Sequence, residues 1–368
     1  MNQSASELPI HTYWLPVDDL GRLYLTPGMT SHPVLPENLA DLGLTVSAGH
    51  PEVPVMQAVD ALHSVRIQAL LVTVERPPSL SGRMPPLLLR EAVKLIQDGV
   101  IDDLITMAAL LRLEQQHLIR ERCEILYRDQ YCVAVYKPAG MLVHRTSADQ
   151  ERENLLALLR DQLGCRVQPV HRLDKPTSGI VLFALEAAST AQFYALFQER
   201  EIEKIYVALV RGFTEASGVI DYPVKDDSGR ELPAVTEYET LSTVELPMPV
   251  GPYATARYSL VKVRLQTGRM HQIRKHFAHL RHPVIGDTKY GDVHHNRLYR
   301  EQFHCYRLML SAVRMNFRHP VTGQDVRIAA PPDWSFGNAL AQIGLLSSLQ
   351  REFDEDGGLN NQATRDKF

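Results

Sequence analysis

Asp174 is the side chain in this sequence with the clearest potential to do chemistry. It lies in the polar segment 171–179, directly before the apolar run 180–184. The proline and glycine of this segment predict a loop that leads into a buried strand. Taken alone, an aspartate in such a segment also fits a turn residue, because Asp is common beside Pro and Gly in turns. A catalytic interpretation therefore needs partners from elsewhere in the chain.

Two further segments supply candidate partners for a reactive carboxylate. Tyr206 lies in the alternating run 202–212, and Arg274 lies in the segment 267–276. An arginine can keep a carboxylate ionised in a pocket that excludes water, and its hydrogen bonds fix the direction of the carboxylate. A tyrosine can stack on a nucleobase while its hydroxyl faces the reacting atoms. Individually, Tyr206 also fits a half-buried strand residue and Arg274 a member of a basic helix face.

Basic residues are concentrated in residues 257–318, here called the basic segment. The whole chain has 39 Lys and Arg against 43 Asp and Glu, a formal net charge of −4. The basic segment holds 13 Lys and Arg against 3 acidic residues, so it carries +10 and the rest of the chain −14. Histidines and tyrosines are interleaved with these charges, a mixture suited to phosphate and base contacts. A nucleic-acid backbone is the favoured partner, and a solvated helical face is the alternative.

Length and composition are those of a globular protein. The 368 residues, 45% hydrophobic and 22% charged, are enough for two or more domains. No apolar run approaches the ~20 residues of a membrane helix. The first residues lack the basic and apolar parts of a secretory signal, so a cytoplasmic location is expected. The 4 cysteines are scattered, which predicts reduced thiols, and no metal or organic cofactor is expected.

Residues 1–122 differ in composition and residue pattern from the rest of the chain. They contain many prolines, a strand-like run at 69–74 and helical patterns at 87–97 and 104–122. We predict a mixed α/β extension of unknown role. At the other end, residues 336–368 are predicted to be a C-terminal tail that is partly disordered.

Residues 123–335 are predicted to form the main domain. Short alternating runs indicate strands, with helical patterns between them, and the segment 137–144 is interpreted as a loop entering a further strand. This mixture predicts an α+β fold built on a mixed, mostly antiparallel sheet with flanking helices. Strands are predicted at 124–127, 132–136, 180–184, 202–212, 234–241 and 256–265, and helices at 154–163, 189–198 and 271–280.

Four motifs together resemble the RluA-type pseudouridine synthases. They are the segments 137–140, 171–179, 204–212 and 267–276, and they occur in the family order. The resemblance implies a pseudouridine-synthase catalytic domain that isomerises a uridine in RNA without a cofactor. Three further segments resemble the branch of the family that modifies a uridine in the T-arm stem of tRNA, uridine 65. These segments are 245–249, 280–287 and 291–297.

The resemblance also implies a role for each matched residue. Asp174 corresponds to the essential aspartate, Tyr206 to the tyrosine beneath the target base, and Arg274 to the arginine paired with the aspartate. Arg172 matches an arginine that helps displace the target base and fills the vacated place in the stack. Ile273 matches an apolar residue that lines the pocket. Further contacts with the pocket or the RNA are expected from Lys137, His171, Arg269 and His271.

The chemistry leaves two routes open for Asp174. It can attack the anomeric carbon, as the nucleophile of a retaining glycosidase does, or remove a sugar proton to give a glycal. Either route requires the uridine to leave the stack. The expected partner is tRNA, bound by a monomer without membrane or metal. The alternatives are a related synthase acting on ribosomal RNA and an RNA-binding or remodelling module whose catalysis is dispensable.

Overall fold

The computed structural model describes residues 122–145, 154–303 and 305–355, together with the backbone of six earlier strands. The chain divides after Arg122 into two compact units. No helix of the described residues is long and apolar enough to cross a membrane.

The described strands of the first unit form one sheet. Its strands are β1 (Ile10–Val17), β2 (Arg22–Tyr24), β3 (Thr45–Val46), β4 (Val53–Asp60), β5 (Val65–Glu75) and β6 (Pro86–Leu88). The pair β1–β5 is parallel and the pair β4–β5 antiparallel. The predicted strand at 69–74 lies within β5 and is confirmed. Residues 87–88, predicted as the start of a helix, belong instead to β6, and the remainder of the two predicted helices, up to residue 121, lies outside the described residues.

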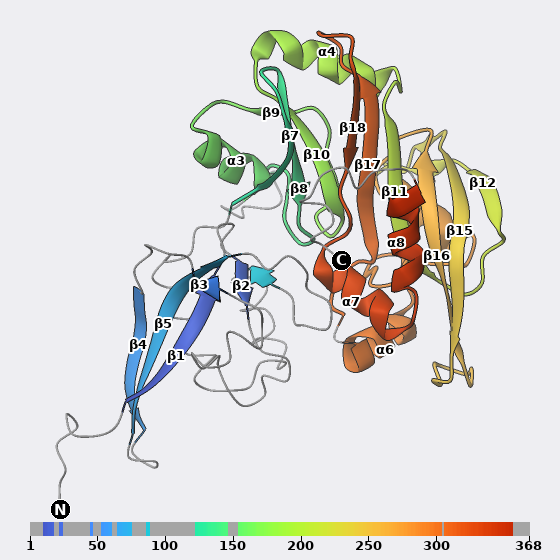
Figure 1. Cartoon of the computed structure of the whole chain (residues 1–368). Helices are drawn as coiled ribbons and strands as arrows, with labels where there is room; N and C mark the ends of the chain where they lie inside the picture. The colour runs from blue at the N-terminus through green and yellow to red at the C-terminus, as the bar shows by residue number, and fades with distance from the viewer. Residues whose placement is uncertain are drawn as a thin grey trace, which may run out of the picture. The chain divides into compact units, whose positions relative to one another are not determined.

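A ten-stranded sheet forms the centre of the second unit (Figure 1). Its strands are β7 (Glu124–Arg128), β8 (Cys132–Lys137), β9 (Gln168–Pro169), β10 (Ser178–Ala184), β11 (Glu203–Arg211), β12 (Ser217–Asp221), β15 (Val235–Leu246), β16 (Ala256–Leu265), β17 (Leu310–Arg318) and β18 (Asp325–Ala329). The order is β12-β15-β16-β11-β17-β10-β8-β7, with β9 beside β10 and β18 beside β17. Only β10 and β17 pair in parallel among these strands, so the predicted mixed, mostly antiparallel sheet is confirmed.

Helices flank this sheet. They are α3 (Leu155–Leu163), α4 (Ala187–Gln198), α5 (Gln272–His279), α6 (Val293–Phe303), α7 (Trp334–Gln342) and α8 (Leu346–Glu355), and a short hairpin joins β13 (Val224–Lys225) to β14 (Glu231–Leu232). The helices predicted at 154–163, 189–198 and 271–280 correspond to α3, α4 and α5.

Both faces of the sheet are covered by apolar side chains around β8 and β10. Val181 and Phe183 of β10 pack in one core with Leu155 and Leu159 of α3. The alternate residues of the same strand pack in a second core with Phe193 of α4. Successive side chains of a strand point to opposite faces, so a strand with apolar residues throughout is expected in the middle of such a layered structure.

Residues 336–355 of the predicted C-terminal tail are helical. They form most of α7 and the whole of α8, and most of their apolar side chains are buried. Glu352 of α8 accepts hydrogen bonds from Arg314 of β17 at 2.7 Å and from Lys262 of β16 at 3.1 Å. Charges buried at this depth need partners, so α8 is an integral part of the second unit.

The predicted strand after the loop at 137–140 does not form in residues 141–145, the described part of this segment. Leu142 and Val143 are buried, but their carbonyl groups accept hydrogen bonds from the backbone of Leu155 and Leu156, at 2.9 and 3.0 Å. These residues therefore satisfy the free N–H groups at the start of α3 instead of joining the sheet.

Gly179 sets the position of the Asp174 loop on the sheet. Its φ is +117°, and a Cβ atom there would lie 2.1 Å from the backbone oxygen of Ala312. Ala312 of β17 is the register partner of Gly179 on one side and of Tyr206 on the other. The loop that ends at β10 is thus separated from Tyr206 by a single intervening strand.

We expect Gly179→Ala to lower the free energy of unfolding by about 3 kcal/mol or more, because the clashing atom is backbone and the φ is unfavourable. Gly164→Ala is the matched control: its φ is also positive, at +64°, but nothing lies within 4 Å of the added Cβ. That change should cost only about 1 kcal/mol. Chemical denaturation of both variants measures the difference, and equal losses would contradict the role of the close approach.

Candidate active site

The structure brings Asp174 and Arg274 together. Asp174 lies in the loop before β10, and Arg274 lies in the first turn of α5. Nη1 of Arg274 donates a hydrogen bond to Oδ2 of Asp174 at 3.2 Å. The arginine side chain is 5% exposed and the aspartate side chain 22%, so the carboxylate is the part of this pair that a substrate can reach.

A second carboxylate, Asp287, holds the other edge of the same guanidinium. Nε and Nη2 of Arg274 donate to Oδ2 and Oδ1 of Asp287, both at 2.8 Å. Burial would raise the pKa of Asp287, but the hydrogen bonds and charge of Arg274 hold the pKa below its ordinary value. Asp287 was not among the predicted site residues. Its place in the segment 280–287 was the available signal.

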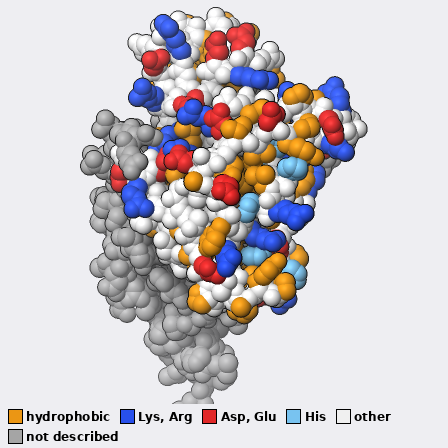
Figure 2. Space-filling model, turned by 90° about the vertical axis from the view of Figure 1, so that its right-hand side faces the viewer, with side chains coloured by type: hydrophobic (Ala, Val, Ile, Leu, Met, Phe, Trp, Pro, Cys, Tyr) orange, Lys and Arg blue, Asp and Glu red, His pale blue; other side chains and the backbone are white. Residues whose placement is uncertain are grey.

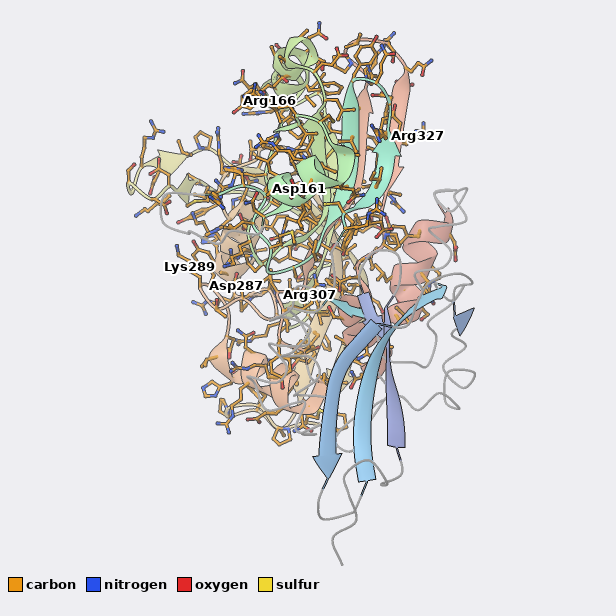
Figure 3. All side chains as sticks on the ribbon, turned by 90° about the vertical axis from the view of Figure 1, so that its left-hand side faces the viewer. Asp161, Arg166, Asp287, Lys289, Arg307 and Arg327 are labelled. Atoms are coloured by element: carbon orange, nitrogen blue, oxygen red, sulfur yellow. The ribbon has the colours of Figure 1, made fainter. Side chains whose placement is uncertain are left out.

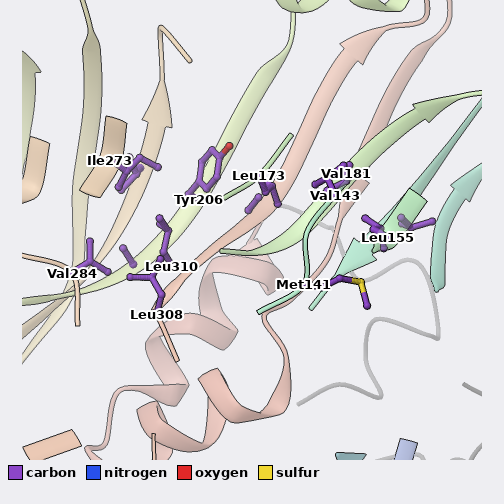
Figure 4. Close-up of a cluster of buried hydrophobic side chains, with 14 of the residues drawn as sticks. Met141, Val143, Leu155, Leu173, Val181, Tyr206, Ile273, Val284, Leu308 and Leu310 are labelled. Carbon is purple, nitrogen blue, oxygen red and sulfur yellow. The ribbon is translucent and has the colours of Figure 1, made fainter. Parts of the chain in front are cut away.

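Tyr206 lies in the apolar floor beside this pair. A β-bulge interrupts the pairing of β11 with β17 between Ile205 and Tyr206. Bulges re-aim side chains and are frequent next to active sites. Figure 4 shows the Tyr206 ring among Leu173 and Ile273, and all three residues belong to the same apolar core. Burial and the charge of Asp174 raise the pKa of Tyr206, so its hydroxyl stays protonated at neutral pH.

The Tyr206 hydroxyl makes no hydrogen bond within the described residues. A buried phenol normally has a polar partner, because leaving a hydroxyl without one is costly. The ring therefore presents an apolar surface and a free polar tip close to Asp174, and Ile273, predicted to line the pocket, lies beside it.

His271 occupies the turn before α5 with a left-handed backbone, φ 57°. Its Nε2 lies 3.8 Å from Oδ2 of Asp174, and its Nδ1 lies 3.0 Å from the hydroxyl of Tyr290. Burial lowers the pKa of His271. The charge of Asp174 raises this pKa, whereas the charge of Arg274 lowers it. The imidazole is therefore neutral near pH 7 and lies beside the pair of Asp174 and Arg274.

Lys137 does not have the exposure expected of an RNA contact. Its side chain is buried, and Nζ donates to the carbonyl oxygens of Pro138, Met141 and Lys175 at 2.8, 2.8 and 3.0 Å. The backbone N–H of Gly140 donates to the same Lys175 oxygen at 2.9 Å. The ammonium group thus joins two loops and fixes the residue next to Asp174.

His171 also anchors the loop from inside. Its Nε2 accepts a hydrogen bond from the backbone N–H of Leu182 at 3.0 Å, and its ring stacks on Phe197 with centroids 4.5 Å apart. Burial, with the charge of Lys204 acting in the same direction, lowers the pKa of His171 to about 3. A neutral ring bonded to β10 fixes the Asp174 loop, and the pocket or RNA contact expected of His171 stays a prediction.

Arg172 and Arg269 differ in how tightly they are held. Arg172 is exposed, and its side chain makes no hydrogen bond or ion pair with any described residue. Arg269 is half-buried and donates to the carbonyl oxygen of Pro233 at 3.2 Å. The start of α5 behind it is fixed by Gln272, whose side chain accepts from the backbone N–H of Arg269 at 3.0 Å and donates to the carbonyl of Val235 at 3.0 Å. Arg172 is thus the side chain beside Asp174 with room to move.

Part of the charge of the basic segment is paired with carboxylates of the same chain. Arg274 and Arg314 are buried against carboxylates, and Arg307 pairs with Asp333. Further partners are Glu352 for Lys262, Glu203 for Arg264, Glu245 for Arg257 and Glu301 for Arg297. Figure 2 shows acidic and basic side chains intermixed on the face that it presents. The +10 of the sequence therefore overstates the charge available to a phosphate backbone.

Asp129, Cys132 and His319 are a group of potential metal ligands at the opposite end of β8 from Lys137. Their ligand atoms lie within 4.8 Å of one another. Both oxygens of Asp129 are already used, one by the backbone N–H groups of Tyr131 and Cys132 and the other by the hydroxyl of Tyr127. Burial raises the pKa of the Cys132 thiol, which disfavours the thiolate that a metal requires. The group fits a hydrogen-bonded turn.

An arginine-held aspartate beside a buried tyrosine, on a mixed sheet, defines a site for acid–base or nucleophilic chemistry on a substrate that stacks. The family described as RNA pseudouridylate synthase matches residues 131–279. A tRNA pseudouridine synthase C from Vibrio cholerae is 46% identical over 238 residues, which are 61% of this chain and 98% of that protein. The protein of the same name from Salmonella typhimurium is 46% identical over 233 residues, 60% of this chain and 90% of its own length.

The chain belongs to the RNA pseudouridylate synthase family. The family assignment made from the four motifs is confirmed. Among solved structures, human RNA pseudouridylate synthase domain containing 1 aligns with a TM-score of 0.46 and 28% identity, covering 57% of this chain and 83% of its own. The assignment rests on the sequence relatives.

The low pKa of His171 predicts a specific pH dependence of stability. Between the ordinary histidine pKa of about 6.5 and the folded value, the unfolded chain binds a proton that the folded chain does not, so stability falls as the pH is lowered. His171→Gln retains an acceptor but does not titrate. From pH 7 to pH 5 the wild type should lose about 1–2 kcal/mol more than the variant, measured by urea denaturation. Parallel losses in the two proteins would show that His171 is not held neutral.

Proposed function

We propose that this protein is a tRNA pseudouridine synthase that isomerises uridine 65 in the T-arm stem. The observation that carries the proposal is the ion pair of the accessible Asp174 with the buried Arg274, beside Tyr206. It stands in a chain that spans nearly the whole of a relative named tRNA pseudouridine synthase C. The substrate leads us to propose a cytoplasmic location, and the three groups come from one chain, which suits a monomer.

The reaction requires the uracil to break its N1–C1′ bond, rotate and rejoin through C5. The target nucleotide first leaves the stack, at a cost of a few kcal/mol that RNA contacts offset. Arg172 is exposed and mobile enough to enter the vacated place. The Tyr206 ring can stack on the extruded base, which must stay bound while it is detached from the sugar.

Asp174 is the proposed reactive group on either chemical route. As a nucleophile its carboxylate would form a bond to C1′ as N1 leaves, and as a base it would take a proton from the sugar. Once C5 is bonded to C1′, the proton on C5 must leave and N1 must gain one. The Tyr206 hydroxyl, protonated and without a partner among the described residues, is suited to assist that exchange.

Cations near the pocket are the proposed contacts with the RNA backbone. Lys275 lies 5.9 Å and Lys289 5.6 Å from the centre of the Tyr290 ring, whose hydroxyl contacts His271 beside Asp174. Lys289 is exposed, and Lys275 is half-buried. Positive side chains at this rim would neutralise phosphates next to the extruded nucleotide.

We assign the reaction to residues 123–335 together with α7 and α8, and we regard residues 1–122 as an extension. The aligned 238 residues already make up 98% of the Vibrio cholerae relative, so the extension has little counterpart there.

Asp174→Asn should abolish product while leaving tRNA binding within about threefold, because the amide keeps the shape of the carboxylate but neither attacks nor accepts a proton. Unmodified tRNA is incubated with each protein, and pseudouridine is mapped along it. Asp161→Asn is the matched control, because Asp161 is an exposed aspartate of α3, outside the loop that carries Asp174 (Figure 3).

Two outcomes would redirect this proposal. Isomerised uridine in ribosomal RNA and none in tRNA would keep the family and remove the tRNA assignment. RNA binding without product in either RNA, together with unchanged function of Asp174→Asn in cells, would favour a binding or remodelling module.

Arg274→Lys should lower kcat by about 100-fold or more, since a lysine cannot hold two carboxylates in a fixed planar geometry. Arg327→Lys serves as the control, because Arg327 is exposed on β18 and lies outside the basic segment. Single-turnover rates on the same tRNA report the chemical step. A similar rate for both variants would remove Arg274 from the proposed machinery.

A further inference from the structure

We infer that Asp287 is a positioning residue for the reaction: it holds one edge of the Arg274 guanidinium and takes up part of its charge, which keeps Asp174 directed and reactive. The inference rests on the proposed function and deepens it. Asp287 lies outside residues 131–279, the part of the chain that matches the family description.

The guanidinium is divided unequally between the two carboxylates. Its Nε and Nη2 form two bonds of 2.8 Å to Asp287, and its Nη1 forms a bond of 3.2 Å to Asp174. The Asp287 side chain is 0% exposed and the Asp174 side chain 22%. The bidentate, buried partner therefore sets the plane of the guanidinium, and Nη1 is aimed by that plane at the reactive carboxylate.

The backbone around Asp287 is fixed by Asn296 of α6. Oδ1 of Asn296 accepts the Gly286 N–H at 2.7 Å, and its Nδ2 donates to the Asp287 carbonyl at 2.8 Å. Oδ1 of Asp287 also accepts the N–H groups of Lys289 and Tyr290, at 2.9 and 3.1 Å. With this support Asp287 has little freedom to follow Arg274, so the arginine must follow Asp287. Figure 3 shows Asp287 and Lys289 close together on this loop.

The other charged or titratable groups around Asp174 are mainly cationic or neutral. Arg274, Lys275 and His271 face it from α5 and the turn before it, and Tyr206 faces it from β11. Further out, Lys289 acts on His271, and Asp226 and Asp227 from the β13–β14 turn act on Lys275. Asp287 is the carboxylate among these described groups that binds the same cation as Asp174.

Charge sharing has a direct chemical consequence. Without the negative charge of Asp287, the whole guanidinium charge would face Asp174 and stabilise its ionised form further. A more strongly stabilised carboxylate is a weaker nucleophile and a weaker base. It would also be less well directed, because the second anchor of the arginine would be lost.

The test compares Asp287→Asn with Asn296→Ala in the full-length protein on unmodified tRNA. Asp287→Asn should lower kcat at least 10-fold, leave the KM for tRNA within twofold, and move the acid limb of the kcat–pH profile to lower pH by ~0.5 unit. Asn296→Ala loosens the same loop but retains the charge. It should lower kcat without moving the acid limb.

Each alternative result has a defined meaning. An unchanged kcat in Asp287→Asn overturns the inference, and so does a lower kcat with an unmoved acid limb, which would indicate structural support only. If Asp287→Asn does not fold, Asp287→Glu retains the charge but displaces the arginine by one methylene. Asp287→Glu should lower kcat at least 3-fold and leave the acid limb of the kcat–pH profile unmoved. A wild-type kcat in this variant overturns the inference. Wild-type protein that forms no pseudouridine in tRNA overturns the proposed function, whereas the other outcomes leave that function intact.

Discussion

A buried arginine that must satisfy two carboxylates is the constraint around which the site is built. A guanidinium taken out of water is stable only when its donors are used, so Arg274 binds Asp287 on one edge and Asp174 on the other. The helix that carries Arg274 is also held at its last turn. His276 of α5 contacts the hydroxyl of Thr236 on β15 and the Tyr222 carbonyl, at 2.9 and 2.8 Å. The helix is thus fixed to the sheet before any substrate is present.

The sheet supplies the other half of the geometry. β17 lies between β10 and β11, and its Ala312 faces Gly179 and Tyr206 at a point where β10 can approach only without a side chain. Asp174 and Tyr206 are 32 positions apart in the sequence, yet the order of three strands brings them to one site. Lys137 and His171 hold the loop that carries Asp174, so this carboxylate is positioned by polar contacts as well as by strand pairing.

The sequence predicted those features that leave a local pattern. Alternating apolar residues located most strands of the second unit, and the three motif residues Asp174, Tyr206 and Arg274 meet in space. Motif membership could not distinguish a side chain that faces substrate from one that supports the loop, since that depends on burial. The motifs therefore did not reveal the contacts that Lys137 and His171 make within the loop. Asp287 was missed because its role exists only through its contact with Arg274.

Electrostatics explains why the basic segment has two opposite uses. Its buried arginines are neutralised by carboxylates from other elements, as Arg314 is by Glu352 of α8, and so they are not available to attract RNA. The attraction for phosphates must come from the exposed cations of the basic segment, which include Arg281 and Lys289. A fully exposed +10 segment would bind any RNA strongly, because phosphate contacts carry no sequence information. Ion pairs within the chain reduce this unselective attraction to phosphates. The extrusion and recognition of one uridine can then contribute a larger share of the binding free energy.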